Sequence, residues 1–259
     1  MSEGLDQARR AALGDRSPRA RGREKDAEAL HWVYRWGWST PVVTDSFASP
    51  NRRGVARRLV GRGLLKEMRT WRSDQWTPRS ILMLTPAGEQ AVEDNLDEQE
   101  RINYRRPRRV PGNLQHDVMA QTLTVRALND PESPITDYLT PREMKGHAPG
   151  KKAPDVIHLD DEGWRLFVEV ELTGKHGPRL HEFMGHLLEA LESINGPDAV
   201  AIRSPSRRLL ERYRDALKTG SSLQGWRRDE RRRQVRKKHL DRLVPDWALS
   251  RIHLKEIAP

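Results

Sequence analysis

A β-favouring run that contains two glutamates, WRLFVEVELT at residues 164–173, constrains the fold more than any other segment. Side chains alternate between the two faces of a strand. The even positions from 166 to 172 are all aliphatic and predict the face that packs on the core. The other face carries Phe167, Glu169 and Glu171. Two neighbouring carboxylates in a sheet repel each other and are costly to remove from water, so this face must hold a partner for them.

The segment before this strand supplies a third carboxylate. PDVIHLDD at residues 154–161 predicts a strand, and Asp160 to Gly163 predict a turn back into the glutamate strand. An antiparallel hairpin of this kind places Asp155 opposite Glu169 and Glu171. Three carboxylates at one sheet edge suit Mg²⁺ or Mn²⁺, which can activate a water and offset charge on a phosphodiester.

The elements around the hairpin predict a mixed α/β (α+β) domain over residues 113–220. Apolar spacing indicates a helix, three strands, a helix, a strand and a last helix. These are expected near 113–130, 135–144, 154–161, 164–173, 179–194, 199–204 and 205–220. The order ends in a βαβ crossover, which favours a sheet with helices packed against it.

Residues 26–100 predict a winged helix-turn-helix domain, because three amphipathic helices precede a two-stranded ribbon and a closing helix. The third helix, expected to begin at Ser49 and Pro50, would enter the major groove of double-stranded DNA. The candidate DNA-binding residues are Arg52, Arg53, Arg57 and Arg58 on this helix and Arg72, Trp76 and Arg79 on the ribbon. The alternative is a small helical domain whose arginines are only solvated.

The flanking segments are rich in charge. Residues 1–25 predict a disordered basic arm, and residues 101–112 predict a linker. Residues 221–259 predict a basic C-terminal extension, with eight Lys or Arg between positions 227 and 238. That cluster is either a surface that follows phosphates or a solvated helix or tail.

The net charge of +10 indicates a polyanionic partner, either nucleic acid or an anionic membrane surface. No apolar run approaches the roughly 20 residues of a membrane span, and no apolar signal core follows the N-terminus. We therefore expect a cytoplasmic protein with no membrane partner. Because the chain has no cysteine, oxygen or imidazole must hold any metal.

The motif PD followed by EVE on the next strand resembles the PD-(D/E)XK nuclease superfamily of restriction-endonuclease-like folds. The resemblance implies that Asp155 and Glu169 bind the metal. Glu171 stands where the family usually has lysine, and Lys175, just past the strand, could reach back to supply the positive charge. It also implies that a residue of the first helix, His116 or Asp117, joins the site.

The chain also resembles, over about residues 26–218, the plasmid replication-relaxation proteins and the MobC-type mobilisation relaxases. The residues that carry this likeness are LQHD at the head of a helix, PD, and VEVELTGK. The likeness implies an endonuclease or nickase that recognises a plasmid or mobile-element origin through its winged helix. It further implies a relaxosome partner protein or a homodimer as assembly partners.

A second interpretation stays open. Because the usual lysine is replaced by Glu171, the chain could be a non-catalytic, sequence-specific DNA-binding protein. A repressor or replication accessory factor of this kind would use the nuclease-like fold as a scaffold. An RNA-binding protein is less favoured, because no aromatic stacking platform of the usual kind is visible.

Overall fold

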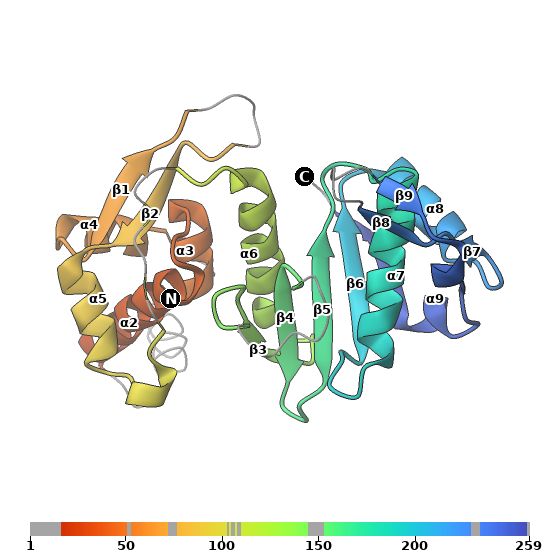
Figure 1. Cartoon of the computed structure of the whole chain (residues 1–259). Helices are drawn as coiled ribbons and strands as arrows, with labels where there is room; N and C mark the ends of the chain where they lie inside the picture. Colours follow the sequence, from red (N-terminus) through yellow and green to blue (C-terminus); the bar gives the residue numbers. More distant parts are fainter. Residues whose placement is uncertain are drawn as a thin grey trace, which may run out of the picture. The chain divides into compact units, whose positions relative to one another are not determined.

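The computed structural model describes residues 17–50, 53–71, 77–102, 104, 107, 110–144, 153–228 and 234–257. The chain divides into two compact units, unit 1 with residues 1–114 and unit 2 with residues 115–259 (Figure 1). The boundary between the units therefore falls at the start of the helix that the sequence places at residue 113.

The first described helix, α2, runs from Pro18 to Trp36. Ser17 caps it by accepting a hydrogen bond from the backbone N–H of Ala20 at 3.1 Å, and Pro18 suits the first helical position. The predicted disordered arm is therefore wrong for residues 18–25, because this start signal outweighs the density of charge. The rest of that arm lies outside the described residues.

Unit 1 continues with two short helices, a two-stranded antiparallel ribbon and a closing helix, in the order that the sequence predicts. Their bounds are α3 (Pro41–Ala48), α4 (Val55–Gly61), β1 (Leu65–Arg69), β2 (Ser80–Leu84), α5 (Pro86–Glu93) and the short helix η1 (Glu98–Glu100). The rings of Trp32 on α2 and Phe47 on α3 lie 4.4 Å apart between centroids. Leu59 and Leu84 are fully buried, so helices and ribbon share one core.

Helix α4 begins later than predicted. Ser49 ends α3 instead of opening α4, which starts after Gly54. The carboxylate of Asp45 on α3 accepts hydrogen bonds from the N–H groups of Gly54 at 2.9 Å and Ala56 at 2.8 Å. These bonds satisfy N–H groups at the helix start from a distant residue, which local sequence patterns do not reveal.

Part of the predicted linker packs on unit 1. The hydroxyl of Tyr104 donates to the carbonyl of Gly37 and accepts from the N–H of Leu84, both at 3.0 Å. Its ring stacks on Tyr34 with centroids 5.7 Å apart. The predicted linker of residues 101–112 therefore begins too early, because a buried aromatic residue holds its start in the core.

Unit 2 is a mixed α/β domain around a five-stranded sheet in the order β11-β6-β5-β4-β3. The strands are β3 (Ile135–Leu139), β4 (Val156–Asp160), β5 (Arg165–Val170), β6 (Ala199–Ser204) and β11 (Ile252–Glu256). Strands β3, β4 and β5 are antiparallel, whereas β6 is parallel to both β5 and β11. The main helices are α6 (Leu114–Asn129), α7 (Pro178–Glu192) and α8 (Arg207–Ala216).

Both faces of this sheet are buried, which corrects the prediction of a single core face. Phe167 joins the core formed by α7 and α8, while Val168 on the opposite face is equally buried. On that opposite face, Thr124 of α6 hydrogen-bonds His158 of β4 at 3.0 Å. Burial, together with the charge of Arg203, lowers the pKa of His158 to about 4, so this histidine is neutral and anchors α6 to the sheet.

The predicted C-terminal extension is wrong, because residues 221–259 complete unit 2. They form β7 (Ser222–Leu223), β8 (Trp226–Arg228), β9 (Gln234–Arg236), η2 (Lys238–Leu240), β10 (Arg242–Leu243), α9 (Ala248–Arg251) and β11. Strand β11 closes one edge of the main sheet beside β6. The basic cluster includes the antiparallel pair β8-β9 rather than a helix or tail.

Candidate active site

Asp155 directly precedes β4 and is fixed against β5. Its backbone N–H donates to the carbonyl of Val168 at 3.0 Å, and its carboxylate accepts from the N–H of Val170 at 2.7 Å. Val156 pairs with Val168 in the sheet, so Asp155 lies beside the stretch that carries Glu169. The predicted hairpin is formed, and it brings the first two predicted metal ligands to one end of the sheet.

His116, in the first turn of α6, joins this end of the sheet. Its Nε2 lies 3.0 Å from a carboxylate oxygen of Asp155, and its Nδ1 lies 3.3 Å from a carboxylate oxygen of Asp117. The hydrogen bonds to Asp117 and Asp155 raise the pKa of His116 to about 10. The imidazole is therefore protonated at neutral pH, and the charge of Asp155 is partly matched by a cation.

Glu171 follows the last residue of β5 and is only 4% exposed. One carboxylate oxygen is paired with the ammonium of Lys175, and the other accepts a hydrogen bond from the hydroxyl of Tyr213 at 3.1 Å. The same hydroxyl accepts from the backbone N–H of Lys175 at 3.2 Å. Burial raises the pKa of Tyr213, so its hydroxyl stays protonated. Lys175 therefore does reach back, and Glu171 holds it in place.

Two residues near this cluster were not predicted from the sequence. Tyr213 lies on α8, far along the chain from Glu171, and no local motif marks it. Arg212, its neighbour on α8, places a guanidinium nitrogen 2.9 Å from Nε2 of His176. Helix α8 thus contributes a hydroxyl to Glu171 and a guanidinium to His176 in the loop after β5.

The structure does not assemble the predicted three-carboxylate metal site. Within the described ranges, no group of three His, Asp or Glu side chains is arranged so that it could hold a metal ion. Both carboxylate oxygens of Glu171 are engaged by Lys175 and Tyr213, whereas Asp155 and Glu169 lie opposite each other at the end of β4 and β5. Mg²⁺ commonly uses one or two carboxylates, with water and substrate phosphate as the other ligands, so two donors fit it.

The candidate DNA-binding arginines of unit 1 fall into two groups. Arg58 on α4 is paired with Asp26 of α2, and Arg62 lies 2.6 Å from the same carboxylate. Arg58 is exposed, as predicted, but its guanidinium also neutralises the buried Asp26. Arg53, Arg57 and Arg79 are exposed.

The remaining predicted contacts, Arg52, Arg72 and Trp76, lie outside the described residues. Beside the last two, Trp71 is 93% exposed at the end of the ribbon. An aromatic ring this exposed is uncommon and was not among the predicted contacts.

The chain was compared with protein-family models, with curated proteins and with solved structures, and none of these comparisons finds a match. The resemblance to nucleases and relaxases therefore stays a prediction. In the part of the chain that the structure describes, no helix is both long and apolar enough to cross a membrane.

The Glu171–Lys175 pair makes a prediction about stability. Lys175→Met should lower the free energy of unfolding by about 2 kcal/mol, because it leaves a buried carboxylate without its cation. This estimate lies below the usual range for buried pairs, since the Lys175 side chain is 28% exposed. The double variant Lys175→Met/Glu171→Gln should recover most of the loss. Urea unfolding followed by circular dichroism measures both, and a double variant no more stable than the single one would contradict the pairing.

Proposed function

We propose that the chain is a DNA-binding, metal-dependent endonuclease or nickase that acts like a relaxase at a plasmid or mobile-element origin. The observation that carries this proposal is the convergence of Asp155, Glu169, His116 and the Glu171–Lys175 pair at one end of the unit 2 sheet. Two carboxylates beside a fixed lysine are suited to phosphodiester hydrolysis. The net charge of +10 supports a nucleic acid as the substrate.

Each side chain of the site has a role in this proposal. Asp155 and Glu169 would hold Mg²⁺ or Mn²⁺, which when bound offsets phosphate charge and lowers the pKa of a water. His116 orients the Asp155 carboxylate through their 3.0 Å contact. Lys175, positioned by Glu171 and Tyr213, can donate to a phosphate oxygen and stabilise the negative charge that grows there.

Unit 1 would supply the sequence recognition. Its element order, α2, α3, α4 and the β1-β2 ribbon, suits a winged helix-turn-helix domain. Helix α4 would face the major groove. Exposed Arg53 lies two residues before this helix, and exposed Arg57 lies in its first turn. Exposed Arg79 lies next to β2 of the ribbon. Arg58 is exposed as well, but its pairing with Asp26 competes with a contact to DNA.

The test is cleavage of a supercoiled plasmid that carries the origin from the element encoding this protein. With Mg²⁺ or Mn²⁺ we expect conversion to relaxed circles or linear DNA, and no conversion with EDTA. Agarose electrophoresis separates the three forms. If neither metal yields product at protein concentrations that fully bind the DNA, the proposed cleavage is wrong.

The alternative is a DNA-binding protein that does not cut. It is favoured by one observation: both oxygens of Glu171 are engaged, so the site offers fewer donors than three carboxylates would. Calorimetry distinguishes the two functions. A protein that takes up no Mn²⁺ at millimolar concentration but still binds the origin would use unit 2 as a scaffold.

A further inference from the structure

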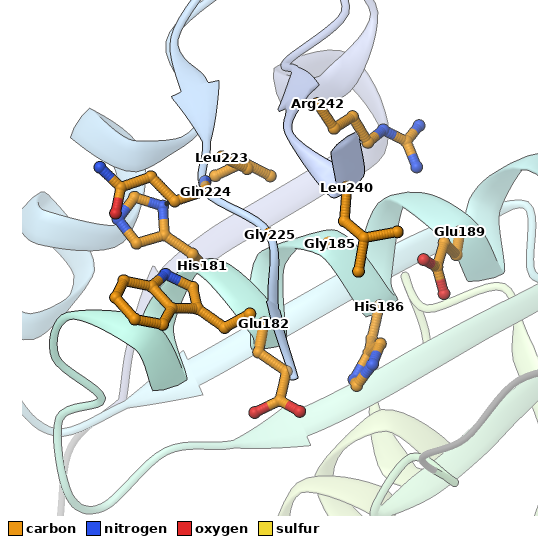
Figure 2. A pocket seen from close by; sticks show the side chains of 11 residues that line it. His181, Glu182, Gly185, His186, Glu189, Leu223, Gln224, Gly225, Leu240 and Arg242 are labelled. Atoms are coloured by element: carbon orange, nitrogen blue, oxygen red, sulfur yellow. Dashed lines mark hydrogen bonds between the residues drawn. The ribbon is translucent and has the colours of Figure 1, made fainter. Parts of the chain in front are cut away.

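A cavity of about 500 Å³ lies on the side of α7 that does not enter the core. Figure 2 shows His181, Glu182 and Gly185 along α7, facing the segment that contains Gln224 and Gly225. Trp226 and Leu240 also line it. A cavity of this size and mixed polarity is typical of small-molecule and nucleobase pockets, and it is separate from the site at Asp155.

The wall opposite α7 is held in place by backbone contacts. The N–H of Gly225 donates to the Asp241 carboxylate at 2.9 Å, and the N–H of Lys237 donates to the carbonyl of Gly225 at 2.8 Å. A Cβ at Gly225 would lie 2.3 Å from Cβ of Leu240, so only glycine permits this close approach. Hydrogen bonds and close packing at Gly225 therefore fix the position of this wall.

The floor of the cavity is kept open by another glycine. Gly185 lies in the interior of α7, where glycine is less favourable than alanine. No heavy atom lies within 4 Å of the position that its Cβ would take. Since no close packing requires glycine there, its effect is to leave room in the cavity.

Polar groups around this space are suited to a flat, hydrogen-bonding ligand. Nδ1 of His181 accepts from the N–H of Gln224 at 3.2 Å, which leaves its Nε2–H as a donor in the neutral ring. Glu182 provides a carboxylate acceptor, whose contact with the Gln234 amide is long at 3.5 Å.

We propose that this cavity binds one unpaired DNA base with an exocyclic amino group: cytosine, adenine or guanine. The amino group would donate to Glu182, while His181 would donate to a ring nitrogen or carbonyl oxygen. Thymine has no amino group and would bind more weakly. This inference rests on the proposed function, since it gives the substrate a single-stranded part near the cut.

The position of the cavity supports a DNA ligand. Lys237 and Lys238, which are exposed, lie next to the wall and can contact the phosphates that flank a bound base. His181 lies six positions after Lys175 (181 − 175), a span of at most about 20 Å. A strand held at Lys175 therefore reaches the cavity within a few nucleotides.

The test measures binding of fluorescein-labelled dT15 oligonucleotides by anisotropy, in EDTA so that nothing is cut. The central position is cytosine, adenine, guanine, thymine or abasic. The wild type is expected to bind the three amino bases about 10-fold more tightly than thymine or the abasic site. Gly185→Leu, which fills the cavity and favours the helix, should abolish that preference. Gly22→Leu is the matched control, because Gly22 also lies in a helix with no heavy atom within 4 Å.

Equal binding of all five oligonucleotides by the wild type would overturn the inference, as would a preference that survives Gly185→Leu in a folded protein. Tighter binding of the matching RNA would overturn the assignment to DNA. Failure of the two proposals is distinguishable. Base preference without plasmid cleavage supports the cavity and contradicts the nuclease, whereas cleavage without base preference does the reverse.

Discussion

The Asp155→Asn protein should fold and bind DNA like the wild type but cut it at least about 100-fold more slowly. An asparagine keeps an oxygen that can accept the hydrogen bond now donated by the N–H of Val170 at 2.7 Å, so the end of β4 stays in place. What is lost is the negative charge that would hold Mg²⁺ beside Glu169. The cation of His116 also loses one of its two carboxylate partners, so its pKa should fall from about 10.

Single-turnover cleavage of the origin plasmid measures the effect, and anisotropy of the bound origin duplex checks DNA binding. Asp161→Asn is the matched control, because Asp161 is exposed on the turn after β4. This control protein should cut at the wild-type rate. An Asp155→Asn protein that cuts as fast as this control would place the chemistry elsewhere.

Removal of residues 246–259 is expected to unfold unit 2. The deletion takes away β11, which pairs with β6 over five residues, and the buried side chains of Ala248, Ile252 and Ile257. It also removes Arg251, whose guanidinium donates to the carbonyls of Leu191, Pro197 and Asp198. Together these losses amount to about 5 kcal/mol or more, which matches the whole stability of many domains.

Hydrogen exchange read by mass spectrometry measures the outcome peptide by peptide. Amides of β5 and β6 should lose their protection, while those of α2 and β2 in unit 1 keep it. A protein shortened by only residues 258–259 is the control. If β6 stays protected without β11, the C-terminal segment is an addition to the fold and not part of it.

Local sequence patterns predicted the hairpin at the site because its signals are local. Alternation defined β5, Asp155 stood at the head of the facing strand, and Gly163 adopts the left-handed φ of 85° that its turn needs. Lys175 was also within reach, since it lies four residues from Glu171. Contacts between residues of one strand or one turn can therefore be predicted from their spacing in the sequence.

The other parts of the site depend on contacts between distant segments. Tyr213 donates a hydrogen bond to Glu171, which is 42 positions away, and no sequence pattern near Tyr213 predicts this contact. The strand β11 was not predicted, because its run at 252–256 is short and its partner β6 lies far away in the sequence, where Ile252 pairs with Val200. The pairing of Arg58 with Asp26 likewise joins residues 32 apart, so an arginine-rich helix alone cannot show which of its side chains are held in ion pairs.

The anchoring of Tyr104 to Gly37 and Leu84 limits the length of the tether between the two units. Ten residues lead from Tyr104 to Leu114, the first residue of α6 (114 − 104), and they span at most about 35 Å. That length equals about 10 base pairs of duplex DNA. If unit 1 recognises the origin and unit 2 cuts it, the length of this segment sets an upper limit on the distance between the two attachment points. The nick then falls at a bounded offset from the recognised sequence, and inserting base pairs between the two should displace or abolish it.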